Sequence, residues 1–303
     1  MRKRTQSGHH GPFAHYGGPV ADTTRDLTVV AADGEALALS VREPAEPRSG
    51  QAALPVLLLH GLSQQRHFWT PVIERLRTRP VAALDQRGHG DSDTPIDADY
   101  SIAACADDVR AALDALGWDQ VVLCGHSWGG AVALAATAAM PDRVVAAELV
   151  DGGLWSLSGL GPRAQVRERL RPPVLDLPID DLWARIRAGD LGETWSQETQ
   201  DALGHTFVVD DSGRARTRIG IDRHMRVLDG MLDYDPTVDL TACEATGVPI
   251  WAVVCERSGA RDVPTRDNLL VHRWAGAIHD VPLQWPALVA GFVDALVESR
   301  EAR

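Results

Sequence analysis

Lysine and asparagine are almost absent from this sequence of 303 residues. Lys3 is the only lysine and Asn268 the only asparagine, so arginine carries nearly all of the positive charge. Acidic residues outnumber basic ones, and the formal net charge is −12 at pH 7. Because like charges repel, this balance argues against nucleic acid or an anionic membrane surface as the main partner.

Long apolar runs and paired cysteines are also missing. No stretch of 18 apolar residues occurs, and the basic start lacks the apolar segment of a secretory signal, so we expect a cytoplasmic protein that does not span a membrane. The four cysteines lack CxxC spacing, which favours buried reduced thiols over a metal site. Residues 1–25, which are basic and contain several Gly and His residues, are expected to form a disordered arm.

Apolar runs and helical patterns alternate from residue 26 onward. A hairpin is predicted where Asp33 and Gly34 separate two alternating apolar and polar segments. Solid apolar runs are typical of parallel strands that are covered on both faces, and they alternate here with helical spacing. We therefore predict an α/β fold with a mostly parallel central sheet flanked by helices. The expected strands lie at 54–59, within the run 81–88, and at 120–124, 143–150 and 249–255.

The interval 155–240 breaks this alternation. It holds several short helical patterns and one probable hairpin that turns between Asp211 and Gly213. Because the alternation resumes afterwards, we interpret 155–240 as a mainly helical cap that is inserted into a core formed by 26–154 and 241–303.

The stretch "LCGHSWGGA" places a serine at a sharp turn between a strand and a helix. Gly125, His126, Ser127, Trp128 and Gly129 form G-x-S-x-G, and this strand-to-helix context makes the motif meaningful. The two glycines are needed where side chains would collide with backbone. The alternative is a glycine-rich helix start at which the serine is only an N-cap. We interpret Ser127 as a nucleophile at the carboxyl end of the sheet.

A nucleophilic serine needs N–H donors for the oxyanion that forms on its substrate. One donor would be the N–H of Trp128, at the start of the helix. The second would come from the loop after strand 54–59, where His60 and Gly61 precede Leu62, whose N–H we expect to donate. The alternative for His60 and Gly61 is an ordinary strand-to-loop turn.

The general base should be a histidine late in the chain. His279, in "GAIHDVPLQWP", stands between the expected last strand and last helix, so its loop can reach the same sheet edge as Ser127. A loop histidine is otherwise most often a surface residue. His126 and His60 lie in glycine-rich loops, and we interpret them as structural.

At this point the chain resembles the α/β-hydrolase-fold enzymes of the esterase, C–C hydrolase and epoxide hydrolase type that carry a helical cap. The matching segments are "LLLHGL", "ALDQRGHGDSD", "GHSWGG" and "AIHDVPLQWP", in the family's order. The resemblance implies Ser127 as nucleophile, His279 as base, and Leu62 and Trp128 as oxyanion donors. A carboxylate at position 127 would have indicated a dehalogenase or an epoxide hydrolase, whereas serine indicates acyl chemistry.

The sequence departs from the family's commonest pattern at the triad acid. Such enzymes usually carry Gly-x-x-Asp after the strand at 249–255, but Ser258 stands in the acid's place here. Asp151, at the end of the preceding strand, is the favoured acid because two glycines follow it and let the chain turn away. Asp262 and, less so, Glu256 are alternatives, and a protein without an acid is another.

We therefore predict a serine hydrolase that cleaves a small, mostly apolar ester or related acyl compound with a Ser-His-Asp triad and needs neither metal nor organic cofactor. One alternative is a cofactor-free C–C hydrolase or lyase that uses the same residues. Another is a member of the fold that binds a small molecule without converting it, which the serine at 258 suggests. The substrate's identity and the oligomeric state do not follow from the sequence.

Overall fold

An eight-stranded sheet lies at the centre of the computed structural model, which describes residues 24–44, 53–92, 95–259 and 262–302. The strand β1 pairs antiparallel with β2, β2 pairs antiparallel with β4, and all later neighbours pair parallel. In spatial order the strands are β1 (Thr24–Val30), β2 (Ala36–Arg42), β4 (Val81–Leu84), β3 (Val56–Leu59), β5 (Val121–His126), β6 (Val144–Val150), β10 (Ile250–Cys255) and β11 (Leu269–Trp274).

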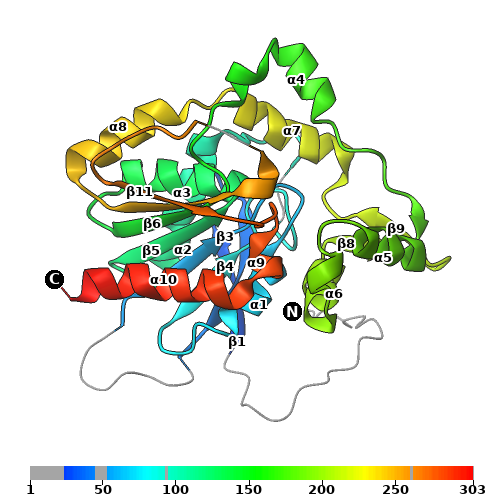
Figure 1. Cartoon of the computed structure of the whole chain (residues 1–303), viewed down its shortest axis with the longest axis horizontal. Helices are drawn as coiled ribbons and strands as arrows, with labels where there is room; N and C mark the ends of the chain where they lie inside the picture. The colour runs from blue at the N-terminus through cyan, green and yellow to red at the C-terminus, as the bar shows by residue number, and fades with distance from the viewer. Residues whose placement is uncertain (1–23, 45–52, 93–94, 260–261, 303) are drawn as a thin grey trace, which may run out of the picture.

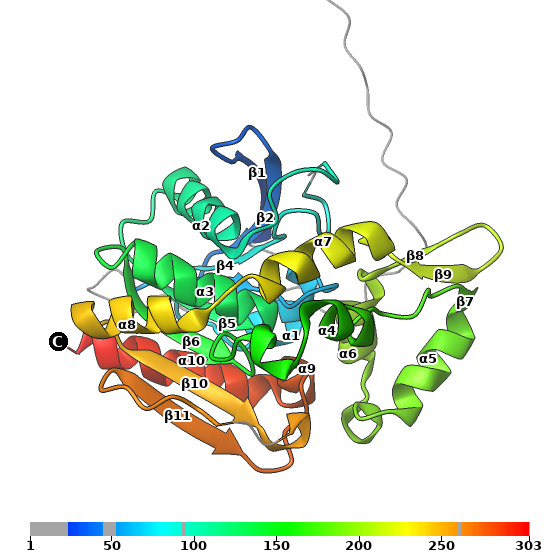
Figure 2. The ribbon, with the colours of Figure 1, turned by 90° about the horizontal axis from the view of Figure 1, so that it is seen from above.

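Helices cover both faces of this sheet, as the predicted parallel strands require (Figures 1 and 2). One face carries α2 (Ile102–Leu116), α3 (Trp128–Ala139) and α8 (Pro236–Thr246). The other carries α1 (Thr70–Ile73), α9 (Val281–Gln284) and α10 (Pro286–Glu301), with the short 3-10 helices η1 (Arg66–Trp69) and η4 (Glu256–Ser258) nearby.

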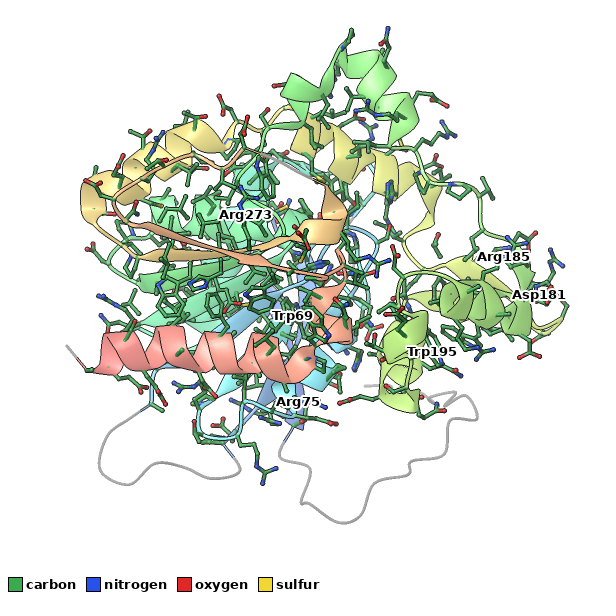
Figure 3. The ribbon with its side chains drawn as sticks, viewed as in Figure 1. Trp69, Arg75, Asp181, Arg185, Trp195 and Arg273 are labelled. Atoms are coloured by element: carbon green, nitrogen blue, oxygen red, sulfur yellow. The ribbon has the colours of Figure 1, made fainter. Side chains whose placement is uncertain are left out.

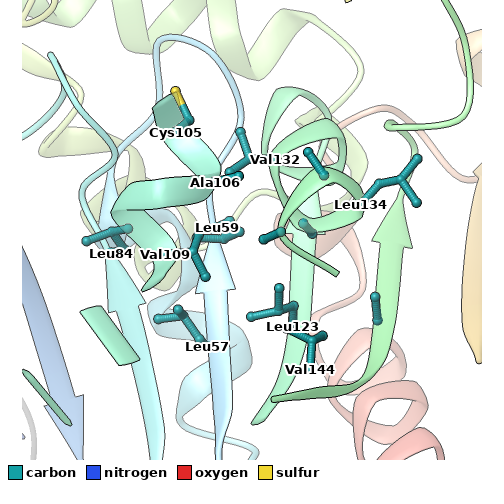
Figure 4. Close-up of a cluster of buried hydrophobic side chains, with 14 of the residues drawn as sticks. Leu57, Leu59, Leu84, Cys105, Ala106, Val109, Leu123, Val132, Leu134 and Val144 are labelled. Carbon is teal, nitrogen blue, oxygen red and sulfur yellow. The ribbon is translucent and has the colours of Figure 1, made fainter. Parts of the chain in front are cut away.

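The two apolar layers explain why the sheet is so regular. Every side chain of β3 and β4 is buried, and Figure 4 shows the layer between the sheet and α2 and α3. Burial of each such leucine or valine contributes on the order of 2 kcal/mol. The helix α2 is bounded by Ser101, whose hydroxyl accepts from the Ala104 N–H, and by Gly117 in the left-handed conformation.

The segment between β6 and α8 contains a second, smaller sheet and most of the short helices. Its elements are η2 (Leu157–Leu160), α4 (Arg163–Arg169), β7 (Leu177–Pro178), α5 (Ile179–Ala188), η3 (Gly192–Thr194), α6 (Gln197–Gly204), β8 (Phe207–Val209), β9 (Arg214–Thr217) and α7 (Gly220–Leu232). In Figure 3 the labelled Trp195 and Arg185 lie on this segment, apart from Trp69 in the sheet layers. The rings of Trp183 and Trp195 pack together with centroids 5.9 Å apart, and Trp195 also packs against the apolar layer on the α10 face of the main sheet.

The structure confirms both predicted hairpins, moves two boundaries and adds one strand. The β1–β2 and β8–β9 pairs are antiparallel, as predicted. Thr24 and Arg25 already belong to β1, and the remainder of the predicted arm lies outside the described residues. The division at 240 falls inside α8, which packs against α3, so we propose that the insertion ends at Asp235.

The third change is at the far edge of the sheet. The sequence predicts the final strand at 249–255, but β11 follows it and pairs parallel with β10. All side chains of β11 are half-buried or exposed because it is an edge strand, so it lacks the solid apolar run of the inner strands. Within the described residues, no helix combines the length and the apolar character needed to cross a bilayer.

Candidate active site

Ser127 lies in the sharp turn that joins β5 to α3. Its φ is 53° and its ψ is −116°, a strained conformation for a residue with a side chain. A Cβ at Gly125 would lie 2.1 Å from the Gly129 carbonyl oxygen, and a Cβ at Gly129 would lie 2.3 Å from the Leu59 carbonyl oxygen. The two flanking glycines therefore permit the close approach that holds the serine at the carboxyl edge of the sheet.

Three side chains from distant parts of the chain form a continuous series of hydrogen bonds. Ser127 Oγ lies 3.0 Å from His279 Nε2, and His279 Nδ1 lies 2.6 Å from Asp151 Oδ2. With the imidazole donating from Nδ1 to the carboxylate, Nε2 is left to accept the serine proton. This arrangement can remove a proton from the hydroxyl as the oxygen attacks an electrophile.

Asp151 is buried directly after β6, and its φ of 48° lies in the left-handed region. Its Oδ1 accepts from the Cys255 N–H at 3.0 Å, and its Oδ2 accepts from the Ser258 hydroxyl at 2.5 Å. Burial on its own would raise the pKa of Asp151, but the hydrogen bonds from His279, Ser258 and Cys255 outweigh burial and lower it. The carboxylate therefore stays ionised beside the imidazole.

The alternative acids lie elsewhere. The side chain of Asp262 is exposed, and its backbone carbonyl accepts from the Trp155 indole N–H at 2.8 Å. Glu256 is also exposed and accepts from the Gly276 N–H. Of the candidate carboxylates, only Asp151 is hydrogen-bonded to His279 in the described part of the chain. Ser258, in the place where the acid was expected, donates to that carboxylate instead.

The loop after β3 lies directly against the serine turn. A Cβ at Gly61 would lie 3.2 Å from Ser127 Cβ, so Leu62 follows at the point where the loop passes the nucleophile. Trp128 is the first residue of α3, and its N–H belongs to the first turn, where donors lack an intrahelical partner. Behind the loop, buried His60 donates from Nδ1 to the Gly61 carbonyl oxygen and accepts at Nε2 from the Gln86 N–H.

Gln64 connects three segments of the site, and the sequence reasoning missed it. Its Oε1 accepts from the Gly61 N–H and lies 3.0 Å from His126 Nδ1, and its Nε2 donates to Asp280 Oδ1 at 2.9 Å. His126 Nε2 lies 2.8 Å from the His279 carbonyl oxygen. Burial, and then the nearby His279, lowers the pKa of His126 to about 3. A glutamine three residues after a glycine carries no pattern from which these contacts could be predicted.

Metal-ligating side chains do not gather in the described residues: no three His, Cys, Asp or Glu side chains form a group that could hold a metal ion. All four cysteines are buried and unpaired. Burial raises the pKa of each of these thiols.

Comparison with known proteins agrees with this architecture. The family model described as the alpha/beta hydrolase fold matches residues 55–178, which include β3, the loop after it and the serine turn. The chain has the α/β-hydrolase fold. Among solved structures, this chain resembles the peroxisomal alpha-beta-hydrolase Lpx1 of Saccharomyces cerevisiae with a TM-score of 0.72 at 18% identity, over 92% of this chain and 89% of the other.

Two further relatives illustrate the range of the superfamily. This chain resembles the structure of E-2-(acetamidomethylene)succinate hydrolase with a TM-score of 0.67 at 22% identity, over 91% of this chain and 99% of the other. It is 34% identical over 159 residues to Lipase LipV of Mycobacterium tuberculosis, which covers 45% of this chain and 60% of that relative. Among the curated relatives it matches, it spans 60% of LipV and 52% of another mycobacterial protein.

Proposed function

We propose that this α/β-hydrolase is a serine hydrolase that cleaves a small, mostly apolar ester or related acyl compound through an acyl-enzyme intermediate. The hydrogen-bond series from Asp151 through His279 to Ser127 carries the proposal. A serine is a weak nucleophile unless a neighbouring base takes its proton, and a base–orienter pair of this geometry supplies that function.

Acylation begins when His279 Nε2 takes the Ser127 proton and the serine oxygen bonds to the substrate carbonyl carbon. The carbonyl electrons move to oxygen, and the N–H groups of Leu62 and Trp128 donate to that oxyanion. When the oxyanion collapses, the bond to the leaving alkoxide breaks and His279 returns the proton to the alcohol. Asp151 orients the imidazole and stabilises its positive charge throughout.

Deacylation repeats the sequence with water. His279 takes a proton from water, the hydroxide bonds to the acyl carbon, and the same two N–H groups hold the second oxyanion. Collapse breaks the bond to Ser127 Oγ, which recovers its proton from His279. The products are one acid and one alcohol, and no redox step is involved.

The preference for an apolar substrate rests on the side chains that contact the expected oxyanion loop. Leu62 packs against a buried apolar cluster of the insertion, and Leu157 joins that cluster. The members from α4 and α7 are Val166, Met225, Leu228 and Leu232. An acyl chain of a few carbons would find aliphatic partners beside Leu62, and the printed name of the relative LipV is consistent with ester hydrolysis.

Ser258 bears on the alternative that the protein only binds a ligand. That alternative depends on the absence of an acid after β10. Because the Ser258 hydroxyl donates to Asp151, the carboxylate next to His279 is supported from that same position. The observation that suggested the binding-only alternative is thus explained without it. C–C bond cleavage would use the same residues, and only the substrate distinguishes it from ester hydrolysis.

The test is covalent labelling by a fluorophosphonate probe, followed by intact mass. The native protein should gain one adduct, Ser127→Ala should gain none, and Asp151→Asn should be labelled on the order of 10⁴ times more slowly. Ser158→Ala, which removes an exposed serine of the insertion, is the matched control and should label like the native protein. A folded native protein that is not labelled, or equal labelling of Ser127→Ala, would refute the proposal.

A further inference from the structure

The insertion helix α7 contacts the loop after β3 at two consecutive residues. The Leu62 side chain packs against the cluster to which α7 contributes Met225 and Leu228. The next residue, Ser63, is hydrogen-bonded through its hydroxyl to His224 Nδ1 on the same helix, at 2.7 Å. The helix therefore contacts both the expected oxyanion donor and its neighbour.

The loop at this point is a β-turn with an unusual third residue. The Gln64 N–H donates to the Gly61 carbonyl oxygen at 3.1 Å, which closes a turn with Leu62 and Ser63 at its centre. Ser63 has a φ of 69°. A third-position φ near +80° is the mark of a type II turn, which favours glycine there. A residue with a side chain is strained in this conformation, so the surrounding contacts must hold it there.

Two hydrogen bonds keep Ser63 in this conformation. The Ser63 N–H donates to His89 Nε2 at 3.3 Å, while His89 Nδ1 donates to the Arg87 carbonyl oxygen. The hydroxyl bond to His224 is the shorter of the two Ser63 contacts. Because His224 is buried at 8% exposure and its pKa is lowered to about 4 by burial, its imidazole is neutral at pH 7.

We propose that His224 is a positioning residue for the oxyanion donor: its hydrogen bond to Ser63 keeps the Gly61–Gln64 turn in its strained form and thereby aims the Leu62 N–H. The inference rests on the proposed function. Without this bond, the turn can relax to a negative φ at Ser63, which rotates the Leu62–Ser63 peptide and displaces Leu62. The position of the insertion is in this way linked to the catalytic loop.

Glycine at position 63 provides a direct test, because glycine adopts a positive φ without strain. Fluorophosphonate labelling rates are compared for the native protein, His224→Ala, Ser63→Gly and the double variant. We expect His224→Ala to be labelled about 10-fold more slowly than the native protein. Loss of a whole oxyanion donor lowers kcat by about 10²–10³, and a displaced donor should lose only part of that. The double variant should recover to within about threefold of the native rate, since the strain that His224 offsets is no longer there.

The controls separate this mechanism from a general loss of packing. Arg226→Ala changes an exposed residue of α7 and should leave the rate unchanged, and thermal melts verify that each variant is folded. A His224→Ala rate equal to the native rate overturns the inference, as does a double variant that stays as slow as His224→Ala. Both results leave the proposed function intact if Ser127→Ala abolishes labelling. Failure to label native protein instead overturns both.

Discussion

Glu148 is the most unusual ionisable residue of the central sheet. It lies in the middle of β6, between Cys124 on β5 and Trp251 on β10, and none of its side chain is exposed. Neither carboxyl oxygen has a hydrogen-bond partner among the described residues. Burial raises the pKa of Glu148 well above its ordinary 4.5, so the side chain is protonated in the folded protein over a range where the unfolded chain is ionised.

The consequence is a stability that falls as the pH rises. Below pH 4.5 both states bind the proton and Glu148 has no pH-dependent effect. Above it, the unfolded state releases the proton and the folded state keeps it, so the unfolded state gains about 1.4 kcal/mol for each pH unit until the folded pKa is reached. Glu148→Gln has nearly the same shape and cannot ionise, so it removes this penalty.

We therefore expect the free energy of unfolding of Glu148→Gln to increase relative to the native protein by about 2.7 kcal/mol between pH 5.5 and pH 7.5, if the folded carboxyl stays protonated throughout. Urea denaturation at the two pH values, followed by tryptophan fluorescence, measures it. Glu193→Gln, at an exposed glutamate, controls for the loss of one carboxyl. A Glu148→Gln difference that does not change with pH would refute the reasoning.

Two other side-chain contacts give predictions of their own. Ser258→Ala should lower kcat about 10- to 100-fold, because a hydrogen bond to a charged group contributes about 1.5–3 kcal/mol. The loss should be larger at acid pH, since without this bond the pKa of Asp151 rises; a pH–rate profile measures both effects, and an unchanged profile would contradict the prediction. Asp108 receives two bonds of 2.6 Å from buried Arg87, so Asp108→Ala should cost about 3–5 kcal/mol in urea denaturation; the exposed neighbour Asp107→Ala is the control, and equal effects would argue against the ion pair.

The parts of the fold that the sequence could predict are those with strong local signals. The inner strands are solid apolar runs, and the turn at Ser127 is specified by its glycines and by the strand and helix on either side. The edge strand β11 could not be found in this way, because half-buried and exposed positions interrupt its apolar pattern. The start of α8 could not be predicted either, because a proline such as Pro236 is typical both of a turn and of the first residue of a helix.

The site was predictable where each residue occupies the end of a strand. Ser127 and Asp151 directly follow β5 and β6, so the parallel sheet brings them to one edge. Gln64 and His224 could not be found in this way. Gln64 is hydrogen-bonded to Asp280, and His224 of the insertion is hydrogen-bonded to Ser63. Both contacts depend on tertiary packing, which no local sequence pattern indicates. The catalytic roles of Ser127, His279 and Asp151 stay predictions until the labelling experiment is done.

The geometry around β10 explains why position 258 holds a serine and not the acid that the family pattern leads one to expect there. Asp151 accepts from the Cys255 N–H and from the Ser258 hydroxyl, so both ends of the turn after β10 are hydrogen-bonded to the carboxylate at the end of β6. A second carboxylate at 258 would lie within hydrogen-bonding distance of Asp151, where two like charges cannot both stay ionised. A hydroxyl there donates instead and stabilises the ionised acid. An acid at the end of β6 therefore favours a donor, and disfavours another acid, after β10.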